Sequence, residues 1–165
     1  MTGTGDVVTG EPGVPRRVVD LLAAAGQTVA AAESLTAGLV CATLAEVPGA
    51  SAVLRGGLVV YATDLKHELA GVPASLLEAE GAVHPEVAAQ LADGVRRRCR
   101  ADWGIGLTGV AGPAAQDGVA PGTVHVAVCG PDGRHARTLE LSGDRDAVRT
   151  GAACGALALL VEQLG

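Results

Sequence analysis

The chain has 165 residues, enough for one domain with a hydrophobic core of its own. Apolar residues make up 48% and charged residues 18%, and no apolar run reaches the roughly 18 residues that a membrane span requires. The formal net charge is −6 and the sequence pI is about 5.1. We therefore expect no membrane partner, and nucleic acid is disfavoured as the main partner.

The apolar residues are mainly Ala, Val and Leu, with no Phe, one Tyr and one Trp. Because small side chains fill space thinly, we expect helices and sheet to pack closely. We also expect part of the core to lie at the interface of a homo-oligomer, a dimer or larger. The one cluster of basic residues, Arg96–Arg98 with Arg100, suits the C-terminus of a helix, where cations complement the helix dipole.

The four cysteines, Cys41, Cys99, Cys129 and Cys154, form no C-x-x-C pair, and no His lies at metal-ligand spacing. We therefore predict buried free thiols, no metal and no cofactor. Residues 1–14 lack the basic and apolar regions of a secretory signal. We expect a flexible tail over 1–14, a single domain over 15–165, and a cytoplasmic location.

Helical and strand patterns alternate along the chain. Periodic stretches with starting and stopping residues predict helices over 15–26, 36–46, 73–80, 85–98 and 144–164, with a short one begun by an Asp64 cap. Apolar runs predict strands over 28–32, 57–61 and 103–108, and a hairpin over 123–129 and 134–141. This order indicates an α/β fold, a three-layer α/β/α sandwich with a mixed, mostly parallel sheet.

Three segments with chemically useful residues each follow a predicted strand: 33–38, 61–66 and 108–113. In open α/β sheets, ligands bind beyond the carboxyl ends of the strands, next to helix N-termini. We therefore expect the three segments to form one site.

Ser34 lies in the strand-to-helix turn Glu33-Ser34-Leu35-Thr36-Ala37-Gly38. Such a turn exposes a hydroxyl and aims backbone N–H groups at one point, which serves either a nucleophile with its oxyanion hole or a bound phosphate. The same pattern is also typical of a serine that only caps a helix.

Lys66 is the only lysine among twelve basic residues. Arg does not release its proton in proteins, whereas a desolvated Lys does, so a lone Lys in an Arg-rich chain indicates acid–base chemistry. The alternative is an exposed helical lysine with Asp64 and Glu68 nearby. Tyr61, the only tyrosine, could relay a proton or orient the Ser–Lys pair, or it could only fill space at a strand end.

The segment Thr108-Gly109-Val110-Ala111-Gly112-Pro113 allows close backbone approach to a ligand, or forms only a tight turn. It lacks the Gly-Lys-Ser/Thr of a Walker A loop. Arg145 opens the last helix, where it could hold a phosphate or carboxylate or stay in solvent. The four histidines do not cluster in sequence, and we assign none to catalysis.

Taken together, these segments resemble the CinA C-terminal-domain family, also called the nicotinamide-nucleotide amidohydrolase (PncC) family. The matching stretches follow the family's order and spacing: AESLTAGLV (32–40), PGAS (48–51), GGLVVYATDLKHELAGV (56–72), GAVHPEVAAQLADG (81–94), TGVAGP (108–113), PGTV (121–124) and GDRDAVR (143–149). The resemblance implies the three-layer fold and a metal-independent hydrolysis of nicotinamide mononucleotide, a small-molecule nucleotide, to nicotinic acid mononucleotide and ammonia.

The resemblance also implies roles for individual residues. The family's catalytic Ser, Tyr and Lys fall on Ser34, Tyr61 and Lys66. Its substrate contacts fall on Thr36, Ala37, Gly38, Thr108, Gly109, Ala111, Gly112 and Arg145. Two departures, Ala37 in place of a common glycine and the less Gly-rich segment 114–116, could narrow the pocket or change its substrate preference.

Two other functions fit the same residues. One is a non-catalytic nucleotide-binding or regulatory module linked to competence or DNA damage, as some relatives are. The other is an amidase for a different substrate. Release of ammonia from nicotinamide mononucleotide would separate the enzyme from the module, and a panel of amides would expose the third case.

Overall fold

The computed structural model describes residues 13–165, so nearly all of the predicted tail over 1–14 lies outside the described residues. Helices and strands alternate through the described part, as the sequence predicts. In chain order they are α1 (Val14–Ala25), β1 (Val29–Glu33), α2 (Leu39–Ala45), the 3-10 turn η1 (Ala50–Ala52), β2 (Leu54–Val59), α3 (Thr63–Glu68), α4 (Ala74–Glu80), α5 (Pro85–Arg98), β3 (Trp103–Gly109), β4 (Thr123–Gly130), β5 (Gly133–Glu140) and α6 (Arg145–Leu164).

The five strands form one sheet in the order β2-β1-β3-β4-β5. β1 pairs in parallel with β2 and with β3, whereas β4 pairs antiparallel with β3 and with β5. Four strands therefore run one way and β4 alone runs against them. The predicted mixed, mostly parallel sheet is confirmed.

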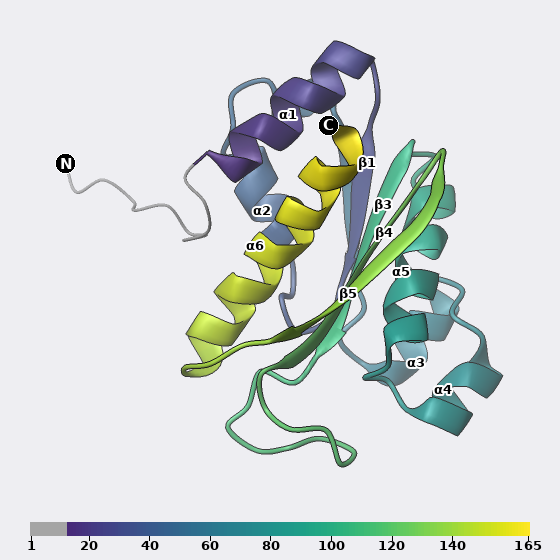
Figure 1. Cartoon of the computed structure of the whole chain (residues 1–165). Coiled ribbons are helices and arrows are strands. Elements are labelled where there is room, and N and C mark those ends of the chain that lie inside the picture. The colour runs from purple at the N-terminus through teal and green to yellow at the C-terminus, as the bar shows by residue number, and fades with distance from the viewer. Residues whose placement is uncertain (1–12) are drawn as a thin grey trace.

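Helices cover both faces of the sheet (Figure 1), with α1, α2 and α6 on one side and α3, α4 and α5 on the other. β1 shows how each face is filled, since its successive side chains point to opposite sides. Val29 and Ala31 join the core under α1, α2 and α6, and Ala30 and Ala32 join the core under α5. The three-layer α/β/α architecture is confirmed. By length and composition α6 could cross a membrane, but its apolar face is buried against α1, α2 and the sheet.

α5 lies unusually close to the sheet because small residues face each other there. A Cβ added to Gly104 of β3 would overlap the carbonyl of Ala92, and one added to Gly106 would overlap the carbonyl of Ala88. Both alanines are fully buried in α5. The helix backbone therefore rests directly on the strand, which is the close packing expected from an Ala- and Gly-rich chain.

Three local predictions differ from the structure. The strand predicted over 57–61 is β2, shifted toward the N-terminus, because an edge strand with two glycines shows no continuous apolar run. The helix predicted over 36–46 begins only at Leu39, since Ala37 and Gly38 have positive φ angles of 49° and 101°. Asp64 is not the cap of α3: the cap position is Ala62, and the Asp64 carboxylate accepts from the Leu65 N–H inside the first turn.

The predictions for cysteines and for the Arg cluster have different outcomes. Of the four cysteines only Cys129 is buried, and the other three are half-buried, so the expectation of buried thiols is wrong for those three. The basic residues 96–98 form the last turn of α5, as predicted. Asp144 caps α6 by accepting from the Ala147 N–H, also as predicted.

Candidate active site

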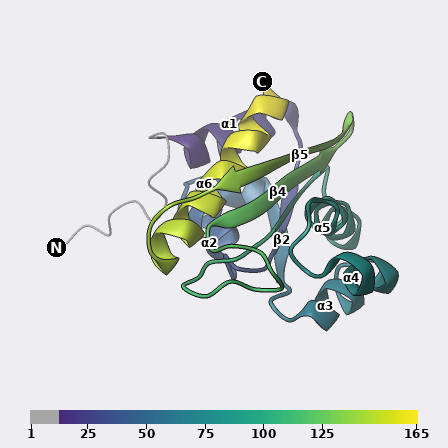
Figure 2. The ribbon, with the colours of Figure 1, turned by 60° about the horizontal axis from the view of Figure 1, so that its bottom comes forward.

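The three segments predicted to share a site lie at one edge of the sheet. β1 lies between β2 and β3, all three run parallel, and the carboxyl ends of all three therefore meet at that edge (Figure 2). A cavity of about 340 Å³ opens there. It is lined by Ser34, Leu35, Tyr61, Lys66, Ala82, Val83, Arg145 and residues 108–116.

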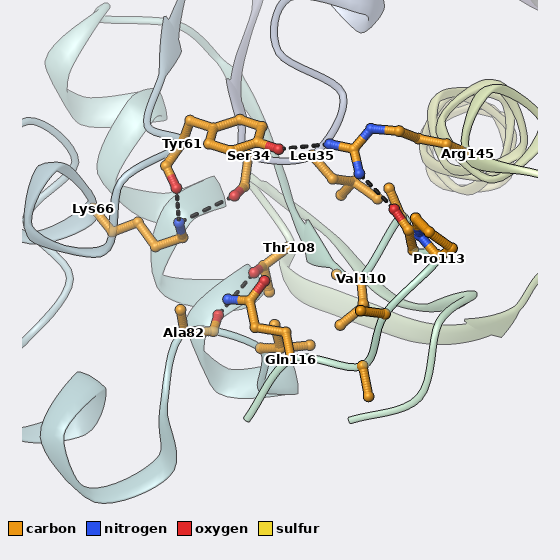
Figure 3. A pocket seen from close by; sticks show the side chains of 16 residues that line it. Ser34, Leu35, Tyr61, Lys66, Ala82, Thr108, Val110, Pro113, Gln116 and Arg145 are labelled. Carbon is orange, nitrogen blue, oxygen red and sulfur yellow. Dashed lines mark hydrogen bonds between the residues drawn. The ribbon is translucent and has the colours of Figure 1, made fainter. Parts of the chain in front are cut away.

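Ser34 and Lys66 meet at the end of this cavity (Figure 3). The Lys66 Nζ lies 3.0 Å from the Ser34 Oγ, 2.8 Å from the carbonyl oxygen of Val60 and 3.2 Å from that of Tyr61. Ser34 follows β1, and Lys66 lies on α3, which follows β2. The Lys66 side chain is only 1% exposed, so it is not the solvated helical lysine that the sequence left open.

The three oxygen neighbours of Lys66 fit a neutral amine as well as an ammonium ion. Two of them, the carbonyls of Val60 and Tyr61, can only accept hydrogen bonds. A neutral amine donates its two N–H bonds to these carbonyls and keeps its lone pair for the Ser34 hydroxyl. An ammonium ion donates its third N–H to the same Oγ. A proton can therefore pass between the Ser34 Oγ and the Lys66 Nζ with no heavy atom changing its partner.

Burial shifts the protonation of Lys66 toward neutrality. Desolvation lowers the pKa of Lys66 from 10.5 to about 8. Desolvation is the only cause of this shift. A usable fraction of Lys66 is therefore neutral near pH 7 to 8, as a general base requires.

Glu33 explains why Ser34 is not a helix cap. The Glu33 Oε1 accepts from the Val40 N–H at 2.8 Å, and Oε2 accepts from the Cys41 N–H at 3.1 Å. Glu33 therefore satisfies the free N–H groups at the start of α2, and Gly38, at the cap position, makes no side-chain cap bond. The Ser34 hydroxyl remains available to Lys66. The sequence reasoning missed this role of Glu33.

The turn after Ser34 consists of two consecutive β-turns. The Ala37 N–H donates to the Ser34 carbonyl and the Leu39 N–H to the Thr36 carbonyl, each at 3.0 Å. The positive φ angles of Ala37 and Gly38 are those of a type I′ turn. Among the described residues, Thr36, Ala37 and Gly38 are absent from the cavity lining, and the Ala37 N–H is already used. Their substrate-contacting roles stay predictions.

Tyr61 and Arg145 meet across the cavity mouth (Figure 3). The Arg145 guanidinium donates to the Tyr61 hydroxyl at 2.8 Å and to the Gly112 carbonyl at 2.6 Å. The Tyr61 side chain is 54% exposed, so it does not fill space in the core. Its hydroxyl contacts Arg145, whereas its main-chain carbonyl contacts Lys66. Tyr61 thus links the cation at the mouth to the amine at the cavity end.

The loop after β3 forms the remaining wall. Thr108, Gly109, Ala111 and Gly112, all predicted as substrate contacts, line the cavity. The Thr108 hydroxyl donates to the Ala82 carbonyl at 2.7 Å and so ties this wall to the segment before α5. Gln116, in the segment that departs from the family pattern, also lines the cavity and was not predicted. Only its position in the folded loop reveals it.

The cavity is positive. Lys66 and Arg145 are its charged lining residues, and no Asp or Glu occurs in the lining as described. No group of three or more His, Cys, Asp or Glu residues that could hold a metal ion is found within residues 13–165. Such a cavity suits an anionic ligand whose reacting carbon reaches Ser34.

Comparisons with known proteins agree on one family. Residues 13–164 match the family model of the CinA C-terminal domain. A CinA-like protein from Anaeromyxobacter sp. (strain K) is 51% identical over 152 residues, which are 92% of this chain and 37% of that protein. One from Frankia casuarinae is 48% identical over 147 residues, 89% of this chain and 34% of that protein. The chain thus spans little more than a third of these curated relatives.

Solved structures of similar proteins have the same fold. The competence/damage inducible protein CihA from Agrobacterium tumefaciens superposes with a TM-score of 0.89 at 31% identity, covering 98% of both chains. A competence-damaged protein (CinA) superfamily protein from Escherichia coli superposes with a TM-score of 0.86 at 27% identity, covering 99% of this chain and 94% of that one.

Proposed function

Because the chain belongs to the CinA C-terminal domain family, we propose that its cavity is the active site of a metal-independent amidohydrolase acting on nicotinamide mononucleotide. Ser34 is the nucleophile and Lys66 the general base. The observation that carries this proposal is the 3.0 Å contact between the Ser34 Oγ and a buried lysine whose pKa is lowered to about 8.

The reaction proceeds in two halves. Neutral Lys66 takes the Ser34 proton as the Oγ attacks the carboxamide carbon, and a tetrahedral oxyanion forms. The carbon–nitrogen bond then breaks, and the Lys66 ammonium returns its proton to the leaving nitrogen, which departs as ammonia. Lys66 next takes a proton from water, the resulting hydroxide attacks the ester, and Ser34 recovers its proton. The products are nicotinic acid mononucleotide and ammonia.

The charges of the cavity support a nucleotide substrate. The Arg145 guanidinium at the mouth is held by two oxygen atoms, the Tyr61 hydroxyl and the Gly112 carbonyl, and its remaining N–H groups would bind phosphate oxygens. The cavity end holds Ser34 and Lys66, so a ligand held by its phosphate at the mouth extends its carboxamide toward the nucleophile.

Ammonia release from nicotinamide mononucleotide tests the proposal. We expect activity in the wild-type protein, none above background in Ser34→Ala and Lys66→Met, and wild-type rates in Arg137→Gln, whose arginine pairs with Glu162 away from the cavity. If Lys66→Met keeps wild-type rates, Lys66 is not the base. A wild-type protein that binds the nucleotide but releases no ammonia would instead be a nucleotide-binding module.

The pH dependence gives a second test. Because the neutral amine is the base and the pKa of Lys66 is about 8, kcat should rise with pH through about 8 and then level off. A profile that is flat from pH 6 to 10 would contradict the role of Lys66.

A further inference from the structure

Arg149 binds the turn that carries the nucleophile. It lies on α6, one turn after Arg145, and reaches segment 34–38 more than a hundred residues earlier in the chain. Its Nε donates to the Leu35 carbonyl at 2.9 Å, and its Nη2 donates to the Thr36 carbonyl at 3.1 Å. Its one ion-pair partner among the described residues, Asp146, is largely exposed, with 3.8 Å between the Arg149 Nη1 and the Asp146 Oδ1.

These two contacts determine how the peptide groups after Ser34 are oriented. The Thr36 carbonyl also accepts from Leu39, but Arg149 is the only partner of the Leu35 carbonyl among the described residues. Leu35 and Thr36 are buried, and among the described residues no other side chain donates to their carbonyls. Arg149 thus prevents rotation of the peptide group between Leu35 and Thr36, because rotation would leave a buried carbonyl without a donor.

The orientation of that peptide group determines where an N–H points. In a trans peptide the carbonyl and the following N–H point in opposite directions. With the Leu35 carbonyl directed at Arg149, the Thr36 N–H points away from Arg149. Within the described residues this N–H has no hydrogen-bond partner, whereas the next one, of Ala37, donates back to Ser34. Thr36 itself is fully buried and lies outside the cavity lining, so Ser34 and Leu35 are the residues of this turn that line the cavity.

We propose that Arg149 is a positioning residue for the nucleophile turn: its bonds to the Leu35 and Thr36 carbonyls fix the backbone that presents Ser34 and Leu35 to the cavity. This role rests on the proposed function only in requiring Ser34 to be an acylated nucleophile; the substrate can differ. Arg149 itself touches neither the substrate nor the reacting atoms.

A substrate-independent probe tests this role. A fluorophosphonate phosphonylates an activated serine: the serine Oγ attacks phosphorus, a P–O bond forms and fluoride leaves. Its rate therefore reports how the nucleophile turn is oriented, and mass spectrometry identifies the labelled residue. We expect Ser34 labelling to slow between about 10-fold and 100-fold in Arg149→Ala, and less in Arg149→Lys. Arg137→Ala is the matched control, since Arg137 also binds α6 but contacts no cavity residue, and it should label at the wild-type rate.

Two further readouts separate positioning from a general loss of structure. Added methylguanidinium should restore labelling in Arg149→Ala, because the side chain it replaces is partly exposed, and should leave Arg137→Ala unchanged. With an amide substrate, kcat should fall while KM stays within about twofold.

The proposal is overturned if Arg149→Ala labels at the wild-type rate, if methylguanidinium does not restore its labelling, or if wild-type Ser34 does not react. A wild-type protein whose Ser34 is labelled with this dependence on Arg149, but which releases no ammonia from nicotinamide mononucleotide, would refute the proposed substrate and leave the positioning role intact.

Discussion

Replacing Lys66 by Met should change how the stability of the protein depends on pH. Below pH 8 both the native and the unfolded chains carry a protonated Lys66, and its burial destabilises the native state. The difference between a pKa of about 8 in the native state and 10.5 in the unfolded state corresponds to about 3 kcal/mol. As the pH rises from 8 to 10.5, the native state releases this proton first, so the wild-type free energy of unfolding gains up to this amount.

Cys41 changes the stability in the opposite direction over an overlapping pH range. Burial raises the pKa of the Cys41 thiol from 9.0 to about 12, with Glu33 adding to the effect. Above pH 9 the unfolded chain loses this proton while the native state retains it, so stability falls. Lys66→Met leaves the Cys41 contribution unchanged, and the chain has no other lysine. Subtracting the variant from the wild type therefore isolates Lys66.

The assay is urea unfolding of both proteins at intervals from pH 7 to 11. Met removes the Lys66 donor from the buried Val60 carbonyl and the part-buried Tyr61 carbonyl, which adds a destabilisation that does not depend on pH. The difference between the two free energies of unfolding should shift in favour of the wild type by about 3 kcal/mol between pH 8 and 10.5. A difference that is constant across this range would show that the native pKa of Lys66 is not lowered, and would remove the argument for a neutral base.

The remaining predictions concern the turn, the sheet and the cavity mouth. Ala37→Gly relieves the positive φ of a non-glycine residue and should stabilise the protein by about 0.5–1 kcal/mol, measured as a higher Tm. Gly106→Ala forces a Cβ against the Ala88 carbonyl and should destabilise it by about 3 kcal/mol in urea unfolding; an unchanged Tm would contradict the close packing of α5. Tyr61→Phe removes one hydrogen bond from Arg145, so steady-state kinetics should show KM rising about tenfold with kcat nearly unchanged, whereas a fall in kcat alone would point to a proton relay.

The sequence predicted the fold and the meeting of Ser34 with Lys66 for the same reason. Both residues follow strands, and parallel strands bring their carboxyl ends to one edge, so the order of the elements is sufficient to place them. The exact start of α2 was not predictable in this way. A serine before an apolar run looks like a cap, and only the structure shows that Glu33 takes that task.

Arg149 could not have been found from the sequence, because its partners are main-chain carbonyls, which every residue has. Its position in the GDRDAVR stretch resembles the family, but that pattern says nothing of which segment the side chain reaches. Gln116 could not be predicted for a similar reason, since a residue on a long loop faces a cavity only once the loop is folded. The expected homo-oligomer stays a prediction.

The two glycines of β3 that face α5, Gly104 and Gly106, also affect the shape of the cavity. Because these two strand residues have no side chains, α5 packs close to the sheet, and the segment before α5 comes within reach of the Thr108 hydroxyl. A thicker layer would lift Ala82 and Val83 away and widen the cavity into an open trough. The absence of Cβ atoms at Gly104 and Gly106 therefore determines how narrow the cavity can be, even though neither glycine lines it.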